Sequence, residues 1–65
     1  MTQLELIELL DAFAIRSGIT QENMAHEIGI TYPTLNAWFN GRHTKMHKAT
    51  EDKVRLFLKA RGELK

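Results

Sequence analysis

Three histidines are the residues of this 65-residue chain that most readily suggest a metal site. His43 and His47 are four residues apart, a spacing that places two imidazoles on one side of a helix, while His26 lies elsewhere. No acidic residue lies between them in the metalloprotease pattern, and the chain has no cysteine. The segment around them also lacks a helical apolar pattern. We therefore expect no metal site.

The remaining residues show no pattern that is typical of a catalytic site. The chain contains neither a glycine-rich phosphate loop nor the serine turn of the hydrolases. A domain of this size also has little room for a substrate pocket. The sequence predicts a protein that is not an enzyme, has no catalytic residues and needs no cofactor.

Polar residues that can read nucleic-acid bases gather in residues 31–40. Asn36 can form two hydrogen bonds with adenine, and Thr34 can bond to several bases. This stretch is predicted to be a helix, because Thr31 can cap it, Pro33 fits its first turn and Asn40-Gly41 can end it. Its inward-facing residues are expected to be Leu35, Trp38 and Phe39.

A second short helix is predicted directly before this one, over residues 20–28. Thr20 can cap it, and Glu22 suits the positive end of its dipole. Gly29 is expected to end it in the left-handed conformation, which turns the chain without a steric penalty. Its inward-facing residues are expected to be Met24, Ala25 and Ile28. Two short helices joined by a tight glycine turn form a helix-turn-helix, whose second helix enters a DNA major groove.

Two longer helices are predicted to complete a single all-α domain over residues 1–65. The first starts with a capping box of Thr2 and Glu5 and ends at Ser17-Gly18. The last is expected to begin at Thr50 and to stop at Gly62, after a basic loop over residues 42–48. Their core-facing residues are expected to be Leu6, Leu9, Leu10, Phe13, Ala14, Val54, Phe57 and Leu58. Leu4, Ile7 and Leu56 fall off these faces and are expected to be exposed.

Residues 18–42 resemble the Cro and phage-repressor type of helix-turn-helix, often called lambda-repressor-like. The shared pattern is Gly18-Ile19-Thr20-Gln21-Glu22, Ala25, Gly29-Ile30-Thr31, Thr34-Leu35, Trp38 and Asn40-Gly41-Arg42. The resemblance implies a small transcriptional regulator, a repressor like Cro from a bacterium, phage or plasmid, that binds double-stranded DNA sequence-specifically. It also implies a homodimer, because two-fold symmetry lets two recognition helices enter successive major grooves about 34 Å apart. The commonest family form has five helices, so with four the dimer must use the first or last helix, or form only on DNA.

The resemblance also assigns individual residues to the DNA. It implies that base readout comes from Tyr32, Pro33, Thr34, Asn36 and Ala37. Contacts to the DNA backbone are implied for Gln21, Asn40, Gly41 and Arg42, and Lys45 and Lys48 extend this set. Relatives often carry Gln or Arg at positions 32 and 33, so their hydrogen bonds do not transfer to this chain. For Tyr32 and Thr34, helix capping and first-turn packing are the alternative interpretation.

The charge is divided unevenly along the chain. Residues 1–30 carry five acidic residues and one basic residue, whereas residues 31–65 carry eight basic and three acidic ones. The basic half is where phosphate contacts are expected, although a solvated surface is the alternative. No apolar run reaches the roughly 18 residues of a membrane span, and the acidic start is unlike a signal peptide. We expect a soluble cytoplasmic protein with no membrane partner and no small-molecule substrate. The rival function is a protein-binding antirepressor or adaptor that uses the apolar edges or the acidic first helix.

Overall fold

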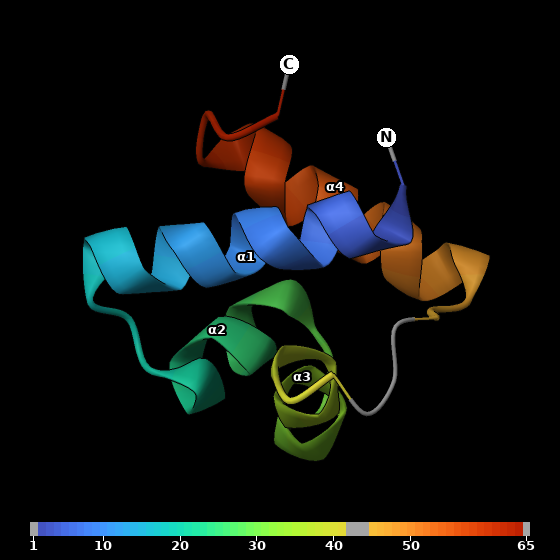
Figure 1. The fold of residues 1–65 in the computed structure, drawn as a ribbon. Helices are drawn as coiled ribbons and strands as arrows, with labels where there is room; N and C mark the ends of the chain where they lie inside the picture. The colour runs from blue at the N-terminus through green and yellow to red at the C-terminus, as the bar shows by residue number, and fades with distance from the viewer. Residues whose placement is uncertain (1, 42–44, 65) are drawn as a thin grey trace.

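The computed structural model describes residues 2–41 and 45–64, and the regular structure in these ranges is entirely helical (Figure 1). The helices are α1 (Gln3–Ser17), α2 (Gln21–Ile28), α3 (Tyr32–Phe39) and α4 (Lys48–Ala60). Figure 1 shows α1 running across the molecule with α2 and α3 below it, and α4 contacts both α1 and α2. The predicted all-α fold is confirmed. None of the helices in the described ranges is long and apolar enough to cross a membrane.

The ends of α1 are closed as the sequence predicts. The Thr2 hydroxyl accepts a hydrogen bond from the Glu5 amide at 3.1 Å, and the Glu5 carboxylate accepts one from the Thr2 amide at 2.9 Å. At the other end Gly18 is left-handed, with a φ of 74°, and its N–H donates to the Ala14 carbonyl at 2.9 Å. These bonds satisfy backbone groups that a helix end otherwise leaves unpaired.

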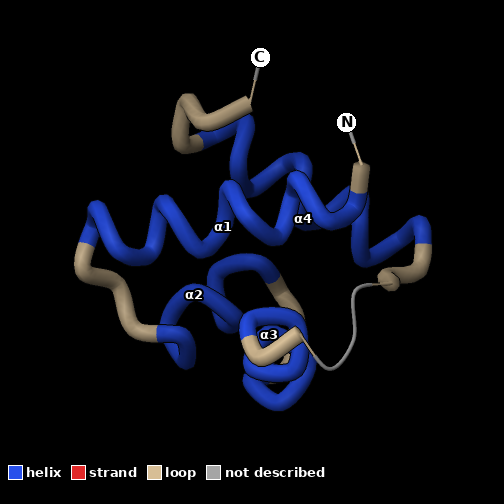
Figure 2. The backbone as a smooth tube through the Cα atoms, viewed as in Figure 1, coloured by secondary structure: helices blue, strands red, loops and turns tan. Residues whose placement is uncertain are grey.

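The turn between α2 and α3 requires glycine for its conformation. Gly29 has a φ of 93°, and its N–H donates to the Ala25 carbonyl at 2.9 Å. A Cβ added at Gly29 would lie 3.8 Å from the nearest atom, the Cδ of Lys53, which is an ordinary contact. Backbone strain, and not lack of space, therefore disfavours other residues at this position. The loop between α2 and α3 in Figure 2 is short, so this turn fixes the angle between the two helices.

Capping of α3 differs from the prediction in one respect. Thr31 is the N-cap residue, but its side chain makes no capping bond to a backbone amide. Its hydroxyl lies 2.7 Å from the Thr34 hydroxyl instead. Pro33, at the second position of the helix, has no N–H to donate, and the Thr31 hydroxyl pairs with the Thr34 side chain rather than with the Thr34 amide.

All four helices of the described ranges contribute to one core. Its fully or nearly buried residues are Leu6, Ile7, Leu10, Met24, Ala25, Ile28, Leu35, Trp38, Val54, Phe57 and Leu58. The expected exposure of Ile7 is wrong, since it is only 5% exposed. Because α1 contacts both α3 and α4, its buried face is wider than the stripe that the sequence suggests. Leu9, Phe13 and Ala14 pack at the margin, and Leu4 and Leu56 are exposed as expected.

The last helix begins two residues earlier than predicted. Helix α4 starts at Lys48, with His47 rather than a threonine as its N-cap, and His47 makes no side-chain capping bond. The Glu51 amide donates to the His47 carbonyl at 2.8 Å. A long-range contact sets this start, because the Gln3 side chain of α1 holds the backbone of Met46 through two hydrogen bonds. Lys48 therefore lies in the first turn of a helix and not in a loop.

Candidate nucleic-acid interface

A shallow hollow lies between the start of α2 and the outer side of α3. It has a volume of about 460 Å³ and is lined by Thr20, Gln21, Glu22, Tyr32 and Asn36. Tyr32 and Asn36 are one helical turn apart on α3, and Gln21 occupies the first position of α2. Gln21, a predicted contact to the DNA backbone, therefore lies in the same hollow as Tyr32 and Asn36, which are predicted to read bases.

A second hollow lies along the opposite side of α3. It has a volume of about 450 Å³, and its lining residues are Pro33, Thr34, Ala37, Trp38, Lys45, Met46, His47 and Thr50. The remaining predicted base-reading residues thus face the segment that leads into α4. The two hollows leave α3 as a ridge with candidate contact residues on both sides.

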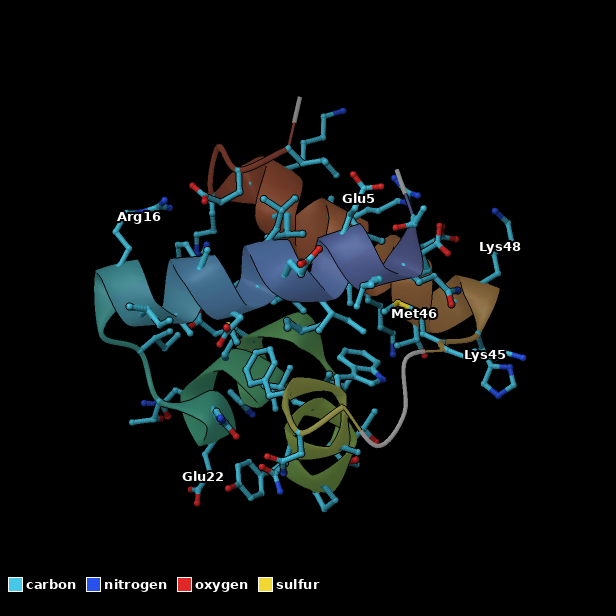
Figure 3. All side chains as sticks on the ribbon, viewed as in Figure 1. Glu5, Arg16, Glu22, Lys45, Met46 and Lys48 are labelled. Atoms are coloured by element: carbon cyan, nitrogen blue, oxygen red, sulfur yellow. The ribbon has the colours of Figure 1, made fainter. Side chains whose placement is uncertain are left out.

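The segment carrying Lys45 is held in place from α1. The Nε2 of Gln3 donates to the Met46 carbonyl at 2.8 Å, and the Met46 amide donates to the Gln3 Oε1 at 3.2 Å. In Figure 3, Lys45, Met46 and Lys48 lie together at the end of the molecule away from Arg16. Gln3 was not among the predicted site residues, because its partner is 43 positions away in the sequence. No local pattern reveals such a contact.

Comparison with protein families decides what this arrangement is. A family model described as helix-turn-helix matches residues 9–50, which include both hollow-forming helices and most of α1. The chain belongs to the helix-turn-helix family. The match also confirms the predicted Cro and phage-repressor type, and with it a DNA-binding function of the transcription-regulator kind. Comparisons with curated proteins and with solved structures found no match.

Hydrogen bonds within the C-terminal end of α3 orient its side-chain and backbone amides. The Asn40 Nδ2 donates to the Asn36 Oδ1 at 3.2 Å, which directs the Asn36 amide nitrogen away from Asn40. The backbone N–H groups of Asn40 and Gly41 donate to the carbonyls of Asn36 and Trp38 at 3.0 and 3.1 Å. At this helix end, side-chain atoms are therefore better placed than backbone amides to donate to a ligand.

Several basic side chains of residues 31–65 bind to other groups of the same domain. Arg55 bonds to the Glu51 carboxylate at 2.8 Å, and Arg61 forms an ion pair with Glu27. Lys53 donates to the Gly29 carbonyl at 3.3 Å. In contrast, Lys45 and Lys48 are exposed, and Lys45 lines the second hollow. Fewer basic side chains are therefore available for phosphate contacts than the eight that residues 31–65 contain.

Hydrogen bonds at the start of α4, the largest of them from Gln3, perturb one acidic group. Hydrogen bonds from Gln3 and Arg55 lower the pKa of Glu51 below its ordinary value of 4.5. Glu51 accepts the bond from Gln3 Nε2 at 3.1 Å, so it is tied to both α1 and α4. The carboxylate is thereby held among partners and does not face the second hollow, whose lining omits it.

Two sequence-derived candidates fall on residues outside the described ranges. Arg42, a predicted backbone contact, and His43, half of the histidine pair considered for metal, lie in residues 42–44. Within the described residues, no three histidine, cysteine or acidic side chains gather as a metal site would require.

Proposed function

We propose that the protein binds double-stranded DNA sequence-specifically, with α3 in the major groove, and acts as a small repressor of the Cro kind. The observation that carries this proposal is the pair of hollows on either side of α3. Together they align the five predicted base-reading residues with two of the predicted backbone contacts, Gln21 and Lys45. A helix that projects as a ridge between such flanks suits a major groove, whose width admits one α-helix.

The base-reading residues have different expected roles. The Asn36 amide nitrogen can donate to adenine N7 while its Oδ1 accepts from N6, in addition to the bond from Asn40. Thr34 shares its hydroxyl with Thr31, so it can donate or accept. Pro33, Ala37 and the Tyr32 ring are expected to contact thymine methyl groups.

Backbone contacts are expected to surround these residues. Gln21 stands at the start of α2, where helix amides and the dipole favour a phosphate. Lys45 and Lys48 are expected to meet phosphates on the other side of the groove, together with Arg42 and the Asn40 side chain. The predicted contact from Gly41 is not retained, because its N–H already donates to the Trp38 carbonyl. These contacts would fix the position of α3 without reading sequence.

Two copies are expected to act together on a palindromic operator. Their recognition helices must then reach major grooves about 34 Å apart on one side of the DNA. A copy alone has α3 as its recognition helix and reads a half-site only.

Matched substitutions at Asn36 and Lys45 test the proposal. Asn36→Ala should lower affinity for the selected site by about 1–3 kcal/mol and leave binding to a scrambled duplex nearly unchanged. Lys45→Ala should weaken both duplexes alike, because a phosphate contact carries no sequence information, and Lys45→Arg should restore binding. Asn23→Ala, on the exposed side of α2, is the control for loss of an asparagine. The proposed position of α3 is wrong if Lys45→Ala changes sequence preference, or if Asn36→Ala weakens both duplexes equally.

A second function is favoured by the outward face of α1. Ile15 is 77% exposed and Leu4 is 54% exposed, and Glu8 and Asp11 lie between them on this face. An adaptor or antirepressor would use such a face to contact another regulator. Absence of binding to any duplex from a random pool at low salt would favour this function over DNA binding.

A further inference from the structure

The second hollow, between α3 and the start of α4, combines apolar and polar lining residues. Its apolar lining residues are Pro33, Ala37, Trp38 and Met46. Its volume of about 450 Å³ is within the range of about 300–1,000 Å³ that is typical of small-molecule pockets. Such pockets are mostly apolar and hold a few polar groups that orient the ligand. The hollow therefore has the size and the composition that a small ligand needs.

Trp38 brings an unpaired hydrogen-bond donor to this hollow. Its side chain lines the hollow and is only 3% exposed, and its buried Nε1 has no acceptor among the described residues. Nearly all buried polar groups of native proteins have a partner, so an unpaired donor indicates a missing acceptor. A DNA phosphate carries a sugar on each side and is too bulky to reach a buried atom. A small molecule that enters the hollow can supply this acceptor.

The start of α4 makes the same hollow favourable for an anion. Helix α4 has 13 residues, and its N-cap residue His47 makes no side-chain capping bond. The first amides of α4 therefore keep hydrogens to donate, and the positive end of the helix dipole lies beside them. His47 and Thr50 line the hollow together with Lys45, and none of the described residues that line it is acidic. A negatively charged group is thus favoured at this end of the hollow.

We propose that the second hollow binds a small aromatic carboxylate that carries a second oxygen acceptor, such as a hydroxybenzoate. The carboxylate lies at the start of α4 beside Lys45, and the second oxygen accepts the hydrogen of Trp38 Nε1. The ring packs among the apolar lining residues, and the thioether of Met46 favours an aromatic ring there. Inorganic phosphate has no apolar part, so it leaves these residues in contact with water.

The ligand and DNA should exclude each other. Thr34, Ala37 and Lys45 line the hollow and are also proposed DNA contacts. A ring beside them blocks the approach of a major groove, and its carboxylate neutralises Lys45 and repels nearby phosphates. The ligand is thus an effector that releases DNA. This exclusion rests on the proposed function, whereas binding of the ligand to the free protein does not.

Nuclear magnetic resonance tests the site directly, because Trp38 is the single tryptophan of the chain and gives one indole N–H signal. Titration with para-hydroxybenzoate should move this signal downfield until the site is saturated, since a hydrogen bond forms at Nε1. Benzoate lacks the second oxygen and should bind at least roughly threefold more weakly. Acetate and inorganic phosphate at the same ionic strength should not move the signal. Equal shifts with all four anions, or an indole signal that para-hydroxybenzoate leaves in place, would overturn the proposal.

Two variants assign the polar contacts, with backbone amide signals as the measure of binding. Lys45→Ala should bind para-hydroxybenzoate roughly threefold more weakly, while Lys59→Ala, which removes the same charge in the last turn of α4, should bind it like the parent. Trp38→Phe keeps a ring without an N–H, so it should bind para-hydroxybenzoate no more tightly than benzoate. Circular dichroism checks that each variant keeps the parent fold. Parent-like affinity in both Lys45→Ala and Trp38→Phe would contradict the assigned site.

Fluorescence anisotropy of a labelled duplex separates this inference from the proposed function. Para-hydroxybenzoate should release the duplex at concentrations near its own dissociation constant, and inorganic phosphate at equal ionic strength should not. A protein that binds the ligand at Trp38 but binds no duplex would reject the proposed function and leave the ligand site intact. Simultaneous binding of ligand and duplex would overturn the exclusion.

Discussion

Trp38 is the residue on which the recognition helix depends most for its packing. It is 3% exposed and lies in the core, yet it also lines the hollow on the Lys45 side of α3. Its Nε1 is buried, and no described residue accepts its hydrogen. The indole therefore contributes apolar contact area but carries an unsatisfied donor, which is costly in an apolar environment.

We predict that the two ways of truncating Trp38 have very different costs. Trp38→Ala should lower the free energy of unfolding by about 3–5 kcal/mol, because it leaves a large cavity. Trp38→Phe should cost much less, since it keeps most of the ring and removes a donor whose burial costs about 1–3 kcal/mol. Urea denaturation followed by circular dichroism measures both. Tyr32→Ala, at an exposed ring on the same helix, is the control, and equal losses for Phe and Ala would contradict this account.

The sequence predicted the core residues only where their burial follows from the apolar spacing along a single helix. Met24, Ala25 and Ile28 follow helical spacing and are buried as expected, as are Val54, Phe57 and Leu58. Ile7 was assigned incorrectly because its burial depends on a second partner helix, which no single-helix pattern contains. For the same reason the role of Gln3 was invisible, since its partners lie 43 and 48 positions away.

At the scale of elements, the junction of α1 with α4 positions the Lys45 side of the interface. Gln3 bonds to the Met46 backbone and to Glu51, and Glu51 also bonds to Arg55. The bonds link the first turn of α1 to the first two turns of α4. They explain why α4 starts at Lys48 although Thr50 is the better capping residue by type.

This junction should make stability depend on acid. The pKa of Glu51 is lowered in the folded protein by the Gln3 and Arg55 bonds. A carboxylate with a lowered folded pKa stabilises the fold above its unfolded pKa, and that stabilisation is lost as the pH falls through the folded value. The free energy of unfolding should therefore decline below the ordinary glutamate pKa of 4.5.

Substitution of Glu51 checks this assignment. In Glu51→Gln the decline between about pH 5 and pH 3 should be shallower than in the parent, because one linked carboxylate is gone. Glu8→Gln, on the outward face of α1, removes the same charge at a distance from the junction and is the matched control. Guanidinium denaturation at several pH values gives the slopes. Parallel profiles for the parent and Glu51→Gln would show that the junction does not contribute to acid sensitivity.

At the scale of the whole molecule, the sequence predicted the fold more completely than the surface. The helix-turn-helix could be read locally, because caps at Thr20 and Gly29 and the apolar spacing all lie within one stretch. The charge surface could not, because internal ion pairs join distant segments. Arg61 pairs with Glu27 and Arg16 pairs with Glu63, so one cation that the sequence counts in the basic half, Arg61, has an acidic partner in the folded domain, and one acidic residue of that half, Glu63, is paired with Arg16.

These internal pairs give a specific value for the salt dependence of DNA binding. Eight basic residues in residues 31–65 would give a slope of log affinity against log salt near −7 if all met phosphates. Arg55, Arg61 and Lys53 have partners within the domain, and Lys59 lies in the last turn of α4. Lys45, which lines the hollow beside α3, and Lys48, at the start of α4, are exposed. With Arg42 we expect about three phosphate contacts per copy, a slope of about −2.7, and roughly 40-fold weaker binding of one copy when salt rises fourfold.

Titration of a single half-site duplex at several salt concentrations measures this slope. Lys45→Ala should reduce its magnitude by about one unit and Glu8→Gln should leave it unchanged. A slope near −7 would mean that the internal ion pairs open on DNA, and a flat profile would mean that α3 does not bind DNA with these flanks.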